Sequence, residues 1–474
     1  MTKDNYNKVR SITLQQLGAI VGESFLTVQT EDLEKYGQDE TEDLVFGPEV
    51  VVKPKTVEQI SAIAKLCHNE RIPLTVRGAG TGLSGGALPV CGGVLLSMEY
   101  FNKILNIDER NLQGTVEPGV INYEFQEAVK ALGLFYPPDP ASWGSCSLGG
   151  NIAHSSGGPK AVKYGTTRDY VLNLEVVLPN GEVIWTGANT LKYSTGYNLT
   201  HLMIGSEGTL GIVTKIVFKL IPLPKHDLLM LVPFKSAEDA CKSVADVFKQ
   251  GIVPSAMEFM ERDAIEWSIK YSGAVSFDIQ PHWEALLLVE VDGNNMDVLM
   301  VDCESISTVM QQNNCDEILF ADSAEQKNAL WKIRRKVGEA VKSNSVYKEE
   351  DTVVPRAELP RLLHGVKNIG NTYGFKSVCY GHAGDGNLHV NIIKGELSDD
   401  QWHNDLPKAI AAIFELCKSL GGTISGEHGI GLVQKKYMPI VFPEYHLDLM
   451  RGIKKVFDPH GILNPGKIFE SQSL

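Results

Sequence analysis

The chain lacks several features that would define its class at once. Its eight cysteines form no Cys-x-x-Cys pair, so the residues suggest neither an iron–sulfur cluster nor a redox dithiol. The first residues contain no apolar stretch of the kind found in a signal peptide, and no hydrophobic run has the length that a bilayer requires. We therefore expect a soluble, cytoplasmic protein.

Positive charge is also scarce. The 44 lysines and arginines are outnumbered by 58 aspartates and glutamates, which gives a formal net charge of -14. Nucleic-acid binding depends largely on clustered cations, so we expect no nucleic-acid partner. The 474 residues, 43% of them hydrophobic and 22% charged, are typical of a globular protein with two or three domains.

The sequence does contain a mixture of helix and strand signals. Thr56-x-x-Gln59 is a capping box that predicts the start of a helix. Residues 172–178 and 183–186 flank Asn180-Gly181, whose tolerance of positive φ suits a tight hairpin turn. After the proline-rich segment 221–226 the pattern changes to long helices alternating with strands. We therefore expect an α+β fold with a separate second domain.

Glycine is abundant between residues 77 and 211. Residues 80–85 satisfy Gly-x-Gly-x-x-Gly after an expected strand, but Gly86, Pro89 and Gly92 break the helix that a dinucleotide-binding turn would open into. A loop of bare backbone amides can instead approach a pyrophosphate without a helix. Further glycine-rich segments follow as far as Gly211, and together they imply a long cofactor that lies against the backbone.

Histidines and acidic residues gather in two glycine-framed motifs. The first contains His382, His389 and Asn391, and the second contains Glu427 and His428. Imidazole and carboxylate together suit zinc, manganese or cobalt. Apolar and polar residues alternate around His389, which places His389 and Asn391 on one face of a strand. Because neighbouring side chains cannot easily share one ion, we expect one of Glu427 and His428 to bind a metal and the other to act differently, for example as a general base.

Taken together, the motifs resemble those of FAD-linked oxidases of the vanillyl-alcohol oxidase type, and more narrowly the branch of D-lactate, D-2-hydroxyglutarate and glycolate dehydrogenases. The resemblance is carried by five segments: Arg77–Gly85, Pro137–Pro140, Leu148–Asn151, Gly205–Gly211 and Asn464–Lys467. It implies an α+β, two-domain FAD-binding fold of that type with an α+β substrate, or cap, domain. The expected parts are an N-terminal helical arm at 1–45, an FAD-binding domain at 46–225, a substrate- and metal-binding cap domain at 226–430, and a segment at 431–474 that returns to the FAD domain.

The resemblance also implies which residues bind the flavin. No histidine lies between 77 and 90, so the chain offers no candidate there for a covalent flavin link and we expect FAD to bind non-covalently. The expected contacts are Arg77, Gly78, Gly80, Thr81, Gly82, Leu83, Ser84, Pro138, Asp139, Ser147, Gly149, Gly150, Asn151, Gly157, Tyr164, Gly165, Glu207, Gly208, Gly211, Ile212 and Asn464.

Other residues match the family's metal and catalytic positions. By resemblance, the metal ligands are His382, His389 and Glu427 and the catalytic base is His428. The matching substrate contacts are Arg334, Lys348 and Asn391, the first two for the substrate carboxylate. Gly338 stands where the hydroxyglutarate enzymes place a threonine, which argues against a preference for hydroxyglutarate.

The expected activity is oxidation of small D-2-hydroxy acids, such as D-lactate or D-2-hydroxyglutarate, to 2-oxo acids with FAD and a divalent metal. Zinc is the expected metal, with manganese or cobalt as alternatives. Electrons must leave for a partner, because the chain has no cluster cysteines. An electron-transfer flavoprotein, an iron–sulfur subunit and a quinone are open options, as are attachment to the periphery of the inner membrane and a homodimer. The alternative functions are a glycolate oxidase FAD subunit and, from another class, a non-flavin metallohydrolase.

Overall fold

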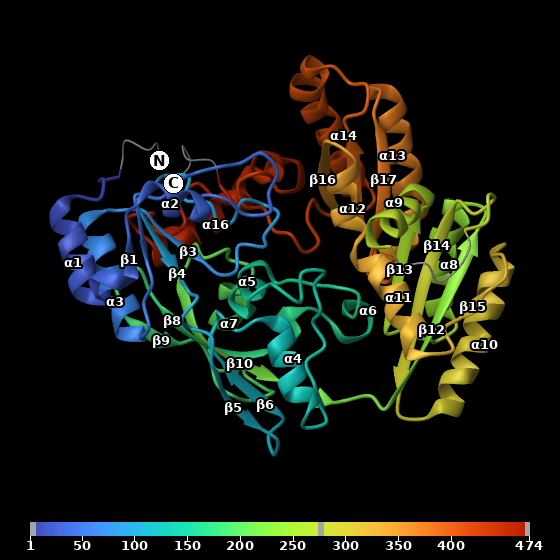
Figure 1. Ribbon diagram of the computed structural model, residues 1–474, viewed down its shortest axis with the longest axis horizontal. Coiled ribbons are helices and arrows are strands. Elements are labelled where there is room, and N and C mark those ends of the chain that lie inside the picture. Colours follow the sequence, from blue (N-terminus) through green and yellow to red (C-terminus); the bar gives the residue numbers. More distant parts are fainter. Residues whose placement is uncertain (1–5, 274–278, 470–474) are drawn as a thin grey trace. The chain divides into compact units, whose positions relative to one another are not determined.

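The computed structural model describes residues 6–273 and 279–469 (Figure 1). Two compact units are present. The first consists of Met1–Ser156, Thr166–Leu223 and Glu427–Leu474, and the second of Gly157–Gly165 and Pro224–Gly426. Within the described ranges, every helix is too short or too polar to cross a membrane.

The first unit begins with a four-stranded sheet of order β1-β2-β4-β3, in which β2, β4 and β3 are parallel. Its strands are β1 (Leu26–Thr27), β2 (Val50–Val52), β3 (Leu74–Arg77) and β4 (Val94–Ser97). Helices α1 (Ser11–Val21) and α3 (Val57–Glu70) bury apolar side chains against it. As the capping box predicts, Thr56 accepts a hydrogen bond from the Gln59 amide at 3.3 Å. A short helix, α2 (Thr30–Tyr36), lies between β1 and β2 in the chain.

A second, antiparallel sheet of order β5-β6-β10-β8-β9 completes the core of this unit. Its strands are β5 (Ile104–Asp108), β6 (Gln113–Val116), β8 (Val171–Val177), β9 (Val183–Trp185) and β10 (Ile212–Lys219), with a separate pair β7 (Leu134–Phe135) and β11 (Ile221–Pro222). The expected hairpin is confirmed, since Val177 pairs with Val183 and Gly181 has φ +87°. The helices are α4 (Asn122–Lys130), α5 (Leu148–His154) and α7 (Leu199–Met203).

The last part of the first unit is a helix and a turn-rich tail. It contains α15 (Met438–Val441) and α16 (Glu444–Phe457). The buried Lys454 ammonium lies 2.5 Å from Asp458 and donates to two carbonyl oxygens, which satisfies a charge that burial alone would not tolerate. Leu463 then bridges to Leu74 in parallel, and Lys467 donates to the Leu88 carbonyl at 2.6 Å. The tail is therefore fastened to β3 and to the loop that follows it.

The second unit is built on one antiparallel sheet of seven strands in its described part, with order β15-β12-β14-β13-β17-β18-β16. Its strands are β12 (His226–Phe234), β13 (Ala256–Glu261), β14 (Ala285–Gly293), β15 (Leu319–Phe320), β16 (Tyr347–Val353), β17 (Lys376–Gly381) and β18 (Asn387–Ile393). One helical layer is formed by α9 (Arg262–Ser272), α11 (Ala324–Arg335) and α12 (Val337–Asn344) (Figure 1). A second layer is formed by α8 (Ala237–Lys249), α10 (Met296–Gln312), α13 (Leu359–Tyr373) and α14 (Leu406–Ser419). The segment 157–165 contributes α6 (Ala161–Tyr164).

The turn between β17 and β18 has little room for side chains. Gly386 has φ +87°, and a Cβ there would collide with the Val354 carbonyl oxygen. Gly395 also has a positive φ, +48°, but a Cβ there would meet no atom within 4 Å. An alanine at Gly395 would therefore meet backbone strain alone, whereas an alanine at Gly386 would meet both backbone strain and a steric collision.

We predict that Gly395→Ala lowers the free energy of unfolding by about 1 kcal/mol, the cost of a left-handed conformation. Gly386→Ala should cost about 1–3 kcal/mol more, because the methyl group also displaces Val354. Urea unfolding followed by circular dichroism measures both. Equal losses would show that the turn relaxes around the methyl group.

Candidate active site

The glycine-rich loop after β3 presents bare backbone. Residues 78–93 form no helix, and Gly80 and Gly85 both have φ +74°. Within the described residues, the amides of residues 80–84 donate to no protein acceptor. The Ala79 amide donates to Ser147 Oγ at 3.3 Å. A run of unpaired amides is an anion-binding feature, so the loop fits a pyrophosphate.

Buried amide side chains connect the next two motifs. Asn151 donates to the Asn122 side chain at 3.0 Å, and Asn122 donates to the Pro138 carbonyl at 3.1 Å. Ser147 caps α5 by accepting from the Gly150 amide. A Cβ at Gly149 would stand 2.6 Å from the Pro118 side chain, so glycine is needed for this helix to pack. The motifs at 137–140 and 147–151 are therefore brought together.

Glu207 and Asn464 connect three further segments of the first unit by hydrogen bonds. Asn464 donates to the carbonyl oxygens of Gly86 and Glu207, at 2.9 and 2.7 Å. The two carboxylate oxygens of Glu207 accept from the amides of Ile430 and Gly431, at 2.8 and 2.7 Å. Burial raises the pKa of Glu207 above its ordinary value. These hydrogen bonds thus join the glycine-rich loop, the C-terminal tail and the chain that follows His428.

Three of the expected flavin contacts, Gly157, Tyr164 and Gly165, belong to the second unit. The reason is a polar attachment of their segment to β14: Tyr164 donates to Asp292 at 2.8 Å, and Lys160 forms an ion pair with Glu290. Their contact with the flavin stays a prediction.

In the second unit, Glu258 of β13 organises His382. His382 follows the last residue of β17, and its Nδ1 lies 2.9 Å from each carboxylate oxygen of Glu258. Arg334 of α11 places Nη2 2.7 Å from the same carboxylate. Although burial raises the pKa of Glu258, the charges of His382 and Arg334 outweigh it, and the net shift is downward. Glu258 is therefore an anion inside the protein.

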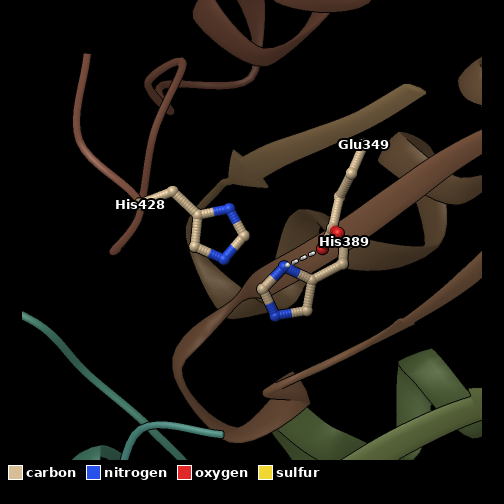
Figure 2. Close-up of side chains that lie close together, drawn as sticks. All are labelled: Glu349, His389 and His428. Carbon is tan, nitrogen blue, oxygen red and sulfur yellow. Dashed lines mark ion pairs between the residues drawn. The ribbon is translucent and has the colours of Figure 1, made fainter. Parts of the chain in front are cut away.

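His389 has a similar neighbourhood. Its Nδ1 lies 3.5 Å from Glu349, an ion pair drawn in Figure 2, and 3.8 Å from Asp351. The rings of His382 and His389 have centroids 5.4 Å apart, and each residue is 4% exposed. The carboxylate at Nδ1 of His382 fixes the tautomer that leaves its Nε2 for a metal. Both histidines fit a zinc-type site.

Glu427 and His428 lie in the chain that leaves the second unit and enters the first. The last residues of the second unit are held by Asp351, whose Oδ2 accepts from Ser425 Oγ at 2.9 Å and from the Gly426 amide at 2.8 Å. Glu427 is joined to Gly426 by a peptide bond, and His428 follows.

The expected substrate contacts divide into two groups. Arg334 and Asn391 are 4% and 0% exposed, and Arg334 Nε and the Asn391 carboxamide make no hydrogen bond of standard geometry in the described part of the chain. The structure does not bring Lys348 to their face of the sheet. Lys348 pairs with Ile392, whereas Glu349 pairs with Asn391. Because side chains alternate along a strand, Glu349, not Lys348, shares the face of Asn391.

Sequence reasoning missed Glu258, Glu349 and Asp351. Glu258 had a detectable signal, because it interrupts the apolar run from Ala256 to Met260, and a lone acid there is rarely buried without a partner. Glu349 and Asp351 belong to an acidic run that resembles a solvated edge. Their role depends on the strand opposite them.

Family models match most of the chain. A model described as "FAD binding domain" matches residues 48–187, and one described as "FAD linked oxidases, C-terminal domain" matches residues 223–468. The chain belongs to the FAD-linked oxidases. The expected FAD-dependent oxidoreductase class is confirmed.

Three relatives named for their activities resemble this FAD-linked oxidase over nearly its whole length. Glycolate oxidase subunit GlcD of Bacillus subtilis is 38% identical over 92% of each chain. D-lactate dehydrogenase of Anaerostipes hadrus is 36% identical over 99% of each. D-2-hydroxyglutarate dehydrogenase of Stutzerimonas stutzeri is 31% identical over 96% of this chain and 98% of its own.

Solved structures establish the fold of this oxidase. p-Cresol methylhydroxylase with substrate bound superimposes with a TM-score of 0.79 at 19% identity, covering 97% of this chain and 96% of that one. 4-Ethylphenol oxidase from Gulosibacter chungangensis gives a TM-score of 0.74 at 18% identity, covering 97% of each chain. The two-domain fold of the vanillyl-alcohol oxidase type is thus confirmed.

We predict that Gly78→Ala weakens FAD binding about tenfold or more, which corresponds to about 1.4 kcal/mol. The new Cβ would collide with Ser147 Oγ, which accepts from Ala79 and caps α5. Flavin absorbance per protein after dialysis measures the loss. Gly47→Ala is the control, because a Cβ there meets no atom within 4 Å. Full flavin retention by Gly78→Ala would contradict the assigned loop.

We also predict that Glu258→Gln lowers zinc affinity about 10- to 100-fold, the range seen when a partner of a metal-binding histidine is lost. Competition with a zinc chelator measures it. Glu290→Gln is a matched control, because Glu290 is also buried but is paired with Lys160. Equal zinc affinity in both variants would contradict a role of Glu258 in metal binding.

Proposed function

We propose that this FAD-linked oxidase converts small D-2-hydroxy acids to 2-oxo acids, with a divalent metal, zinc or alternatively manganese or cobalt, in the second unit. One observation carries the proposal: two buried histidines with carboxylates at Nδ1 share a unit with Arg334 and Asn391, which are buried and incompletely bonded. The relatives named for D-lactate, glycolate and D-2-hydroxyglutarate support the substrate class.

In the proposed site, Arg334 holds the substrate carboxylate. One guanidinium nitrogen is already paired with Glu258, while Nε–H has no acceptor among the described residues. A buried donor of this kind costs stability unless a ligand completes it. Asn391, on the face of β18 that also carries His389, can donate to or accept from the same ligand.

His382, His389 and Glu427 are the proposed metal ligands. The metal, when bound, would act as a Lewis acid and lower the pKa of the substrate hydroxyl. Glu258 orients the His382 imidazole through Nδ1, which leaves its Nε2 for the metal, and Glu349 lies 3.5 Å from Nδ1 of His389.

His428 is the proposed base that accepts the hydroxyl proton. FAD, when bound, would accept the hydride from C2, so the alcohol loses one hydride and one proton and becomes a ketone. Glu427 and His428 are adjacent, which allows one to bind the metal while the other stays available for the proton. The flavin's electrons then pass to a partner acceptor: an electron-transfer flavoprotein, an iron–sulfur subunit or a quinone.

The visible spectrum of the anaerobic protein tests this function. D-lactate, L-lactate, glycolate, D-malate and D-2-hydroxyglutarate are added in separate cuvettes. Bleaching of the flavin by a D-acid and not by L-lactate is the expected result. Bleaching by glycolate alone would favour the glycolate oxidase alternative, and bleaching by none of the acids would refute the proposed substrate class.

We predict that His428→Asn retains FAD and metal but slows flavin reduction at least about 100-fold, the usual contribution of a general base. Stopped-flow reduction by the acid that bleaches the unaltered protein gives the rate. His446→Asn, an exchange in α16 outside the proposed site, is the control. A His428→Asn rate within a few-fold of the unaltered protein would exclude His428 as the base.

A further inference from the structure

We infer that Glu349 restricts the enzyme to 2-hydroxy acids that carry a single carboxylate. This inference rests on the proposed function and names the substrate class within it. The relatives do not decide the class, because they are named for D-lactate and for D-2-hydroxyglutarate alike. The deciding feature is a negative charge on the face of the sheet that carries the proposed ligand-binding side chains.

The pairing of β16 with β18 puts Glu349 on that face. The register runs without interruption from Tyr347 opposite Ile393 to Val353 opposite Asn387, with Glu349 opposite Asn391. Directly opposed residues of an antiparallel pair project from the same face. Glu349 is therefore a neighbour of the proposed substrate contact Asn391.

The contacts of Glu349 keep it pointing at the site. Its Oε1 lies 3.5 Å from His389 Nδ1 and accepts from the Tyr380 hydroxyl at 3.4 Å. The Tyr380 hydroxyl is therefore a donor beside the Glu349 carboxylate.

Gly338 leaves room for this arrangement. A Cβ at Gly338 would stand 3.2 Å from the Tyr380 hydroxyl oxygen, closer than most real contacts of that kind. Any larger side chain in this position of α12 would press on the hydroxyl that holds Glu349. Glycine at this position therefore leaves the Tyr380 hydroxyl free to donate to Glu349.

Charge then separates two classes of substrate. The first carboxylate of a substrate can use Arg334, whose guanidinium lies over the Tyr380 ring with its carbon 5.2 Å from the centroid. A second carboxylate on the same face would meet the charge of Glu349. Like charges several ångströms apart in a site shielded from water repel strongly, and a repulsive group of this kind is an effective means of discrimination.

The test compares Glu349→Gln with the unaltered holoenzyme. The ratio of kcat/KM for D-malate to that for D-lactate should rise about tenfold or more when one like charge is removed. The dissociation constants of pyruvate and 2-oxoglutarate, read from the perturbed flavin spectrum, give the same comparison without turnover. Metal content is measured in each variant, because Glu349 contacts His389.

Glu350→Gln is the matched control, because Glu350 precedes Asp351 on β16, projects from the opposite face and loses the same charge. Glu350→Gln should leave unchanged both the kcat/KM ratio of D-malate to D-lactate and the ratio of the dissociation constants of pyruvate and 2-oxoglutarate. A Glu349→Gln ratio equal to that of the control, or an unaltered enzyme that prefers D-malate or D-2-hydroxyglutarate to D-lactate, would overturn the inference while the proposed function stands. If no acid bleaches the unaltered flavin, the proposed function fails and the inference fails with it.

Discussion

The second unit depends on the burial of one carboxylate. Glu258 is completely inaccessible to solvent and remains ionised, because His382 and Arg334 both contact it. An ionised group in a protein interior is tolerated only when its partners compensate for the lost water. β13, the end of β17 and α11 must therefore meet at this point. The same carboxylate orients His382 by its Nδ1 and pairs with one guanidinium nitrogen of Arg334, so one buried charge positions two side chains of the proposed site.

The second constraint is strand register. On β16 and β18, opposed pairs alternate between a polar face with His389, Asn391, Glu349 and Asp351 and the opposite face. A shift by one residue would exchange the two faces completely. The polar face is adjacent to the buried cluster that includes Trp331, Val337 and Tyr380, so its carboxylates lie among apolar neighbours. Electrostatic interactions are stronger there than at a solvated surface, because the local dielectric constant is lower.

Two further carboxylates determine the path of the chain around Glu427 and His428. Asp351 holds the amide of Gly426, and Glu207 holds the amides of Ile430 and Gly431. Each anchor belongs to its own unit, and the two residues with proposed roles lie between them. The Glu207 anchor is strong because a buried carboxylate that accepts two amide hydrogens is costly to release.

The sequence alone determined the cofactor class and much of the local structure. Capping by Thr56, the Asn180-Gly181 hairpin and the glycine-rich loop after β3 are local effects, because each depends on residues within a few positions of one another. His382 and His389, and likewise Glu427 and His428, could be proposed as site residues for the same reason, because each glycine-framed motif keeps its two members close in sequence. The tertiary structure decided what surrounds them. Glu258 lies 124 residues from His382, and the choice of Glu349 over Lys348 follows from pairing with a strand some forty positions away. Long-range pairing and the compensation of a buried charge have no local pattern, since both depend on which distant segment the folded chain brings alongside.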